Sequence, residues 1–203
     1  MAIAAVVLAA GRGSRIATGD PKPLLEHRGR PLVAWALDAA VASGCAPVLL
    51  VVGHAAEAVA AHATPPVEVV ESRDWEAGIS RSLQAALQAL ESDTSVTAAI
   101  IGLADQPRVG AGAYRRLAAA GEGGAEIAVA TYHGIRGNPV LLGRSVWADA
   151  RELTGDEGAR QLMRVRAVVE VDCTGTGDPA DVDTLDDLAA LDDAPPSSAA
   201  ETP

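Results

Sequence analysis

The chain lacks phenylalanine and has few aromatic residues of any kind, with three tryptophans and two tyrosines among 203 residues. A core without large rings must be filled by alanine, valine and leucine, which favours helices packed closely on a sheet. Cysteine is also scarce. Cys45 and Cys173 lack the paired spacing of a metal site, and the four histidines form no metal motif, so both cysteines are expected to be buried thiols.

Basic residues are also fewer than acidic ones. Lysine and arginine number 16 against 27 acidic residues, giving a net charge of −11, and such a field repels nucleic acids and anionic membranes. The first apolar run has no basic leader and is too short to span a bilayer, so we expect a soluble cytoplasmic protein. With no linker-like segment before the last dozen residues, we expect one domain over 1–191 and a disordered tail over 192–203.

The basic charge that is present gathers near the N-terminus. Residues 1–30 hold a net positive charge, whereas the rest of the chain is strongly acidic. The basic side chains of this segment are Arg12, Arg15, Lys22, Arg28 and Arg30. Lys22 is the only lysine in the chain. An anionic substrate would therefore find local positive charge at this segment, or would need a metal ion.

Apolar strands alternate with helices along the chain. The expected strands cover residues 3–9, 48–52, 67–70, 98–103, 127–131 and 168–171, with an edge strand at 139–142 because it begins with proline. The expected helices cover residues 31–43, 55–63, 78–90, 113–120, 144–153, 157–164 and 184–191. Strands that are apolar throughout suit a parallel sheet covered on both faces. The sequence therefore predicts a three-layer α/β/α fold around a mostly parallel, Rossmann-like sheet.

A glycine-rich turn follows the first expected strand, in the segment Leu8-Ala9-Ala10-Gly11-Arg12-Gly13-Ser14-Arg15. Gly-x-Gly allows a tight turn whose outward amides could cradle a phosphate, and Lys22 nearby suits one phosphate oxygen as a point charge. The dinucleotide fingerprint fails because position 16 is Ile16, and the Walker A pattern fails because Lys22 lies nine residues after Gly13. A plain strand-to-helix turn is the open alternative.

Two aspartates are candidate metal ligands. Asp105 directly follows a buried strand and Asp183 lies in the loop after the last one, and ligands of open α/β sheets bind beyond the carboxyl ends of strands. Hard cations such as Mg²⁺ prefer carboxylate oxygens. The alternatives are structural: Asp105 could serve the turn before Pro107, and Asp183 could cap the helix that follows Thr184.

Other candidates have equally ordinary explanations. Ser80 and Ser82 stand at an expected helix start, where anions bind but where serine is also a common N-cap. The segment 136–139 could be a plain turn. His54 and Trp75 are expected to be packing residues.

Taken together, these stretches resemble the nucleotidyltransferases that transfer a nucleoside monophosphate from an NTP, and among them the molybdenum cofactor cytidylyltransferases. The landmarks are Leu-Ala-Ala-Gly-Arg-Gly-Ser-Arg at 8–15, Pro-Lys-Pro-Leu-Leu at 21–25, Gly-Arg-Pro-Leu-Val at 29–33, Trp-x-x-Gly-Ile-x-x-Ser-Leu at 75–83, Leu-Ala-Asp-Gln-Pro at 103–107, Arg-Gly-Asn-Pro-Val at 136–140, Thr-Gly-Asp-Glu-Gly-Ala-Arg at 154–160 and Asp-Val-Asp-Thr at 181–184. The opening landmark is shared with many sugar-nucleotide transferases, whereas those at 103–107 and 154–160 are more specific.

The resemblance implies a fold of the nucleotide-diphospho-sugar transferase type and transfer of CMP from CTP to the terminal phosphate of molybdopterin, with Mg²⁺ as cofactor and release of pyrophosphate. The implied catalytic residues are Lys22, Arg15 and Asp105, and the implied metal ligands are Asp105 and Asp183. The implied nucleotide-binding residues are Leu8, Ala9, Ala10, Gly11, Arg12, Gly13, Lys22, Gly78, Ser80 and Ser82, with Asn138 and Asp156 on the acceptor side. A molybdoenzyme would receive the product. The alternatives are a transferase for another phosphorylated molecule, such as a sugar phosphate, and a non-catalytic carrier of the cofactor.

Overall fold

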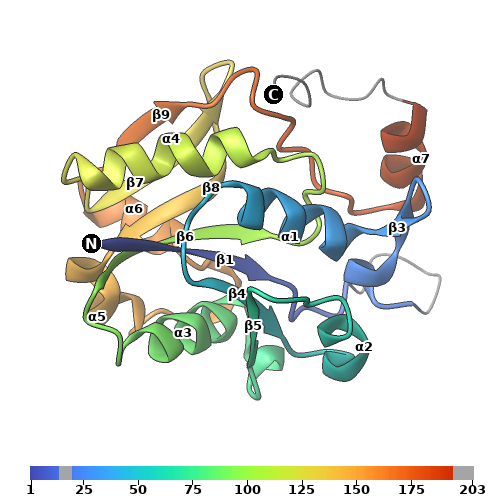
Figure 1. Ribbon diagram of the computed structural model, residues 1–203, viewed down its shortest axis with the longest axis horizontal. Coiled ribbons are helices and arrows are strands. Elements are labelled where there is room, and N and C mark those ends of the chain that lie inside the picture. Colours follow the sequence, from blue (N-terminus) through green and yellow to red (C-terminus); the bar gives the residue numbers. More distant parts are fainter. Residues whose placement is uncertain (14–19, 194–203) are drawn as a thin grey trace.

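A computed structural model describes residues 1–13 and 20–193, and it is built around a seven-stranded sheet (Figure 1). Its strands are β1 (Ala2–Leu8), β4 (Val48–Val52), β5 (Val67–Glu71), β6 (Val96–Leu103), β7 (Ile127–Tyr132), β8 (Ile135–Gly143) and β9 (Val169–Asp172). They lie in the order β5-β4-β1-β6-β8-β7-β9. β2 (Glu26–His27) and β3 (Arg30–Pro31) form a separate antiparallel hairpin.

The seven-stranded sheet is mostly parallel, which confirms the predicted fold class. β1 pairs in parallel with β4 and β6, β4 with β5, and β7 with β9, whereas β8 runs antiparallel to both of its neighbours. The central strands are buried almost throughout. Such strands need cover on both faces, because each presents apolar side chains to either side.

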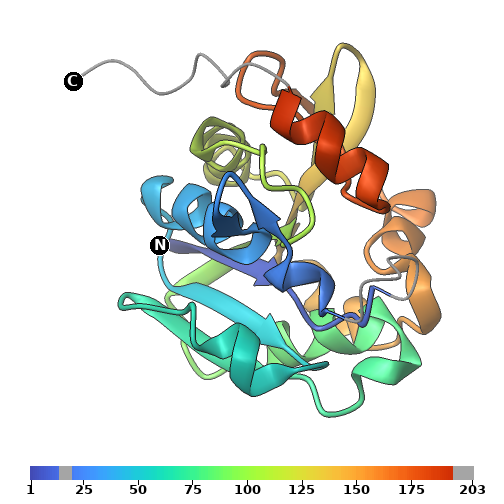
Figure 2. The ribbon, with the colours of Figure 1, turned by 90° about the vertical axis from the view of Figure 1, so that its right-hand side faces the viewer.

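Helices supply that cover. They are α1 (Leu32–Ala42), α2 (Ala56–Ala60), α3 (Ile79–Leu90), α4 (Ala111–Glu122), α5 (Trp147–Ala150), α6 (Arg160–Val165) and α7 (Leu185–Asp193), with 3₁₀ turns η1 (Lys22–Leu24), η2 (Trp75–Ala77), η3 (Arg144–Val146) and η4 (Gly155–Glu157). α1, α2 and α4 pack on one face of the sheet, and α3, α5 and α6 pack on the other. Figures 1 and 2 show these layers. No described helix is long and apolar enough to cross a membrane.

Strand β8 corrects one prediction. It was expected to be an edge strand because of Pro139, yet it lies between β6 and β7. Proline is tolerated there because pairing with β6 begins only at Val140, and pairing with β7 is interrupted between Arg136 and Val140. The missing amide hydrogen of Pro139 therefore falls where the ladder needs no donor.

A small third apolar cluster joins the two ends of the described chain. Leu25 and Leu32, which flank the β2–β3 hairpin, pack with Val182 and with Leu191 of α7. Figure 2 shows α7 beside the N-terminal hairpin. This packing brings the segments that carry Lys22 and Asp183 to the same side of the molecule. The single domain over 1–191 remains a prediction. So does the disordered tail over 192–203: its first two positions belong to α7, and residues 194–203 lie outside the described residues.

Candidate nucleotide and metal site

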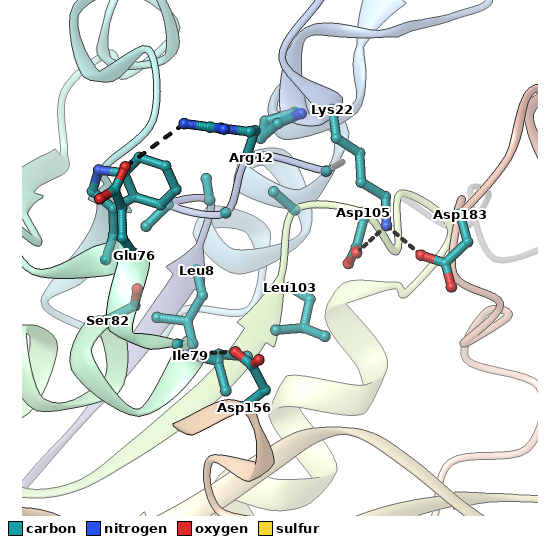
Figure 3. Close-up of a pocket in the computed structure, with 18 residues that line it drawn as sticks. Leu8, Arg12, Lys22, Glu76, Ile79, Ser82, Leu103, Asp105, Asp156 and Asp183 are labelled. Carbon is teal, nitrogen blue, oxygen red and sulfur yellow. Dashed lines mark hydrogen bonds and ion pairs between the residues drawn. The ribbon is translucent and has the colours of Figure 1, made fainter. Parts of the chain in front are cut away.

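An open cavity of about 390 Å³ lies beyond the carboxyl ends of β1 and β6 (Figure 3). Its lining comes from separate parts of the chain: Leu8 to Gly13, Lys22 and Pro23, Trp75 to Ile79 without Ala77, Ser82, Leu103 to Asp105, Asp156 and Asp183. This is the edge at which parallel sheets bind ligands, because each strand there is followed by a loop. The structure therefore brings most of the residues singled out in the sequence to one hollow.

The glycine loop lines this cavity from Leu8 to Gly13. Gly13 adopts φ +65°, and any Cβ at this position would overlap the side chain of Lys22, so glycine is required both by the turn and by the close approach. The amides of Gly11, Arg12 and Gly13 donate no hydrogen bond to any described residue, which leaves them available to an anion. Arg15, predicted to be catalytic, lies outside the described residues.

Lys22 is the central cation of the cavity. Its Nζ lies 2.6 Å from Asp105 Oδ2 and 2.8 Å from Asp183 Oδ1, and the whole residue is only 9% exposed (Figure 3). Burial alone lowers the pKa of this ammonium, but the charges and hydrogen bonds of the two carboxylates outweigh it and hold the pKa above its ordinary value. Lys22 is therefore charged at neutral pH and joins both predicted metal ligands.

The segment that carries Asp183 is attached directly to the end of β6. The amide of Val182 donates to the carbonyl of Asp105 at 2.9 Å, and Gln106 Nε2 donates to the carbonyl of Pro179 at 2.7 Å. Burial and the nearby Asp105 charge raise the pKa of Asp181, which shows that the carboxylates crowd one another. The attachments at Gln106 and Val182 oppose that repulsion.

Asp183 does not serve as the cap of α7. Thr184 and Asp187 form a reciprocal capping box, in which the Thr184 amide donates to Asp187 Oδ2 at 2.8 Å and the Asp187 amide donates to Thr184 Oγ1 at 3.1 Å. Thr184 and Asp187 therefore perform the capping role that was considered for Asp183, and the Asp183 carboxylate points to Lys22.

The carboxylates of Asp105 and Asp183 fit a hard divalent cation. Asp105 Oδ1 is buried and makes no hydrogen bond within residues 1–13 and 20–193, so one ligand oxygen is left without a partner. No cluster of three or more histidine, cysteine or acidic side chains in those ranges has metal-binding geometry. Mg²⁺ commonly takes one or two protein carboxylates and completes its shell with phosphate oxygens and water. The donor set therefore suits a metal ion that arrives with a phosphorylated substrate.

The start of α3 forms the opposite wall. Gly78 has φ +108°, and a Cβ there would lie 2.5 Å from the backbone of Gly155, so η4 packs directly against it. Asp156 Oδ1 accepts a hydrogen bond from the Ile79 amide at 3.3 Å, so this carboxylate occupies part of the helix N-terminus. Ser82 lines the cavity, whereas Ser80 is fully buried outside it and its hydroxyl has no partner among the described residues. Neither serine is the N-cap, which is Gly78.

Trp75 and Glu76 line the cavity, although no site role was predicted for Glu76 and Trp75, itself part of a landmark, was expected to be a packing residue. The Arg12 guanidinium lies 5.7 Å from the centre of the Trp75 ring and its Nη2 lies 3.6 Å from Glu76 Oε1 (Figure 3). Both members of that ion pair are well exposed, so the pair is weak and easily exchanged for a ligand. The Trp-x-x-Gly-Ile spacing could have indicated a wall of the site, since it places Trp75 one turn before α3.

The comparisons with known proteins agree with this geometry. Residues 5–171 match the family model described as a MobA-like NTP transferase domain. The chain belongs to the MobA-like NTP transferase family. This membership supports nucleotidyltransferase chemistry in general and agrees with the placement of the glycine loop and Asp105 in one cavity.

Individual relatives of this MobA-like domain carry different names. The nicotine blue oxidoreductase of Paenarthrobacter nicotinovorans is 32% identical over 200 residues, which is 93% of this chain and 96% of that protein. The crystal structure of Rv0371c from Mycobacterium tuberculosis superposes with a TM-score of 0.80 at 33% identity, covering 95% of this chain and 98% of that one, and Rv0371c has also been solved as a manganese complex. The 4-diphosphocytidyl-2C-methyl-D-erythritol synthase of Anaerococcus prevotii covers 94% of both chains with a TM-score of 0.72 at 14% identity, a likeness of fold alone.

Proposed function

We propose that this MobA-like domain is a Mg²⁺-dependent nucleotidyltransferase that transfers CMP from CTP to the terminal phosphate of a molybdopterin-type acceptor. The observation that carries the proposal is the ammonium of Lys22 held between Asp105 and Asp183, beside a glycine loop whose amides donate to no residue that the structure describes. CTP and the acceptor are suggested by the motif resemblance, chiefly Leu-Ala-Asp-Gln-Pro and Thr-Gly-Asp-Glu-Gly-Ala-Arg.

In the proposed reaction, a terminal phosphate oxygen of the acceptor attacks the α-phosphorus of CTP. The new phosphorus–oxygen bond forms as the bond to the oxygen that bridges the α- and β-phosphates breaks, and pyrophosphate leaves with that electron pair. The loop amides and Arg12 would hold the β- and γ-phosphates, with Arg15 assigned the same task by resemblance. Lys22 would neutralise charge on the α-phosphate oxygens, since catalysis of this kind depends on positioning and electrostatics.

Mg²⁺ held by Asp105 and Asp183 would supply positive charge to the phosphate oxygens when bound. Ser82 and Gly78 would contact the nucleotide, with Ser80 behind them. Asn138 and Asp156 would lie on the acceptor side. A net acidic protein would then bring two anionic substrates together only at this basic loop and metal site.

The deciding experiment offers each of the four NTPs with Mg²⁺ to the protein together with molybdopterin, with and without bound molybdenum, and measures pyrophosphate. CTP is expected to give the fastest release. Release that requires a sugar phosphate instead would identify the other phosphorylated acceptor, and no release with any NTP would contradict the transferase and favour a carrier.

A second candidate follows from the named relative that spans nearly the whole chain, because that relative is called an oxidoreductase. Nicotine blue should then be consumed when an electron donor or acceptor is supplied. This activity without any pyrophosphate release would replace the transferase proposal.

A further inference from the structure

The ammonium of Lys22 lies where a metal ion shared by Asp105 and Asp183 would have to bind (Figure 3). One atom, Nζ, is 2.6 Å from Asp105 Oδ2 and 2.8 Å from Asp183 Oδ1. A Mg²⁺ ion that bridges the same two oxygens at about 2.1 Å would lie close to that ammonium, and two cations so close repel each other strongly. The metal ion and the lysine therefore compete for these carboxylates.

Lys22 also offsets the repulsion between these two carboxylates. Its side chain is only 11% exposed, so solvent screens the contacts little. One positive charge in contact with both groups can hold the segment of Asp183 beside Asp105 without a metal ion. A divalent ion carries twice that charge and can displace the ammonium, but only if the ammonium gains another anion, because a shielded charge without a partner is costly.

The backbone of Lys22 is fixed, so only the end of its side chain can move. Lys22 begins η1 between Pro21 and Pro23, and the two proline rings restrict the chain on either side. The base of the side chain lies directly against the glycine loop, since a Cβ at Gly13 would come within 2.4 Å of Lys22 Cβ. The ammonium can therefore leave the carboxylates only by rotation of its flexible four-carbon stem.

An anion held by the glycine loop would give the displaced ammonium a new partner. Gly11, Arg12 and Gly13 line the same cavity as Lys22, and their amides donate to no residue that the structure describes. Phosphate oxygens bound there would accept hydrogen bonds from the loop and from the ammonium. A metal ion that arrives on a polyphosphate would thus take the carboxylates while the phosphate takes the lysine.

We propose that Lys22 is an internal counter-ion that closes the metal site, and that a divalent cation enters together with a polyphosphate rather than before it. A bare ion must move the ammonium away from both carboxylates without supplying another anion, and this cost weakens its binding. An ion bound to a polyphosphate supplies that anion. The identity of the polyphosphate as a nucleoside triphosphate rests on the proposed nucleotidyl transfer, whereas the competition between metal and lysine does not.

The first test measures binding of Mn²⁺ to the full chain by calorimetry, without nucleotide. Lys22→Met should raise Mn²⁺ affinity at least about fivefold, the effect of one like charge removed from about 4 Å in water. Arg12→Met is the matched control, because Arg12 lines the same cavity but pairs with the exposed Glu76 (Figure 3). Its effect should stay within about twofold, since salt screens exposed charges. Unchanged or lower Mn²⁺ affinity in Lys22→Met, or an equal rise in both variants, would overturn the inference.

The wild-type protein provides an independent arm, because Lys22 is its only lysine. Incorporation of ¹⁵N-labelled lysine therefore gives one Nζ signal in NMR spectra. That signal should move when Mg²⁺ saturates the protein, and it should move at a lower Mg²⁺ concentration when α,β-methylene-CTP is present. A signal that stays in place at saturating Mg²⁺ would show that the lysine keeps its carboxylates. The same Mg²⁺ dependence with and without the analogue would contradict joint entry of metal and polyphosphate.

Release of pyrophosphate by the wild-type protein distinguishes failure of this inference from failure of the proposed function. If Lys22→Met binds Mn²⁺ more tightly but no NTP yields pyrophosphate, the transferase proposal falls and the counter-ion role of Lys22 stands. If CTP yields pyrophosphate but neither the Mn²⁺ affinity nor the Nζ signal responds as expected, the counter-ion role falls and the transfer chemistry stands.

Discussion

The site cavity, here the first cavity, shares Leu8, Ile79, Leu103 and Asp156 with a second cavity of about 210 Å³, and the two differ in the origin of their lining. The charged side chains of the first cavity all lie in loops or short turns: Arg12, Lys22, Glu76, Asp105, Asp156 and Asp183. The second cavity takes its aliphatic floor from strands and helices scattered over the chain, and each of those side chains also belongs to the core. A short sequence motif can therefore reveal the charged groups of a site, whereas an apolar cavity forms only where elements that are distant in the chain pack together.

The largest effect that would test this division is expected from Lys22→Met. Removal of the ammonium should lower turnover at least about tenfold, the scale of one lost electrostatic stabiliser. Release of pyrophosphate from CTP measures the turnover. Arg30→Met, at an exposed ion pair with Asp38, is the control for loss of a cation. Turnover equal to that of the wild type would remove Lys22 from the mechanism.

Asp105→Asn should act through the metal. The amide keeps the shape of the side chain but removes the charge that a hard cation requires, so Mn²⁺ affinity should fall roughly tenfold, comparable to losing one ligand contact. Asp38→Asn, in the exposed pair with Arg30, should bind Mn²⁺ as the wild type does. An Asp105 variant with unaltered metal response would return that residue to the turn role considered in the sequence.

Gln106→Leu should reach the same metal site indirectly. Without this amide, the repulsion among the carboxylates can move the segment of Asp183 away, and Mn²⁺ affinity should fall a few-fold, about the effect of one lost hydrogen bond. Gln84→Leu is the matched control, because Gln84 Nε2 also donates to backbone carbonyls, those of Ala150, Arg151 and Leu153 at and just after the end of α5. We expect both variants to lose the same thermal stability, and only Gln106→Leu to lose Mn²⁺ affinity. Similar Mn²⁺ affinity in both variants would contradict a positioning role.

The smallest effect concerns pH. Because the carboxylates hold the folded-state pKa of Lys22 above its ordinary value of 10.5, the stabilisation from this cation is complete below 10.5 and is lost as the pH rises through the higher folded-state pKa. The difference in Tm between the wild type and Lys22→Met should therefore be constant from neutral pH to about 9.5 and should narrow above 10.5. A difference that already vanishes near pH 8 would show that the ion pairs do not form in solution.

Much of the fold could be read from the sequence, because local patterns and sheet physics agree. Apolar runs predicted the buried strands, and the pattern over 78–90 predicted the helix whose buried face carries Leu83, Leu87 and Leu90. The prediction of an edge strand at Pro139 was wrong, because proline excludes a central strand only when the ladder of hydrogen bonds is continuous there. In β8 the pairing is interrupted at Pro139. The η2 turn with Trp75 was missed because three residues carry no periodic signal.

The candidate site could be read only in part. The sequence by itself determined which groups carry charge: a lone lysine beside Gly-x-Gly, and aspartates after strands. It left Asp183 undecided between cap and ligand, and it could not exclude Ser80 from the cavity wall. These questions depend on which way a side chain points, which neighbouring residues along the chain do not fix.

Tertiary structure decided the rest, for a physical reason. Lys22 and Asp183 are 161 positions apart in the chain, and only packing of Leu25, Leu32, Val182 and Leu191 with the attachments to the end of β6 brings their charges within 2.8 Å. The apolar cavity likewise forms because β8 runs between β6 and β7 while α3 and α6 cover it. Sequence specifies the chemical groups, and the long-range burial of apolar side chains determines which of them meet.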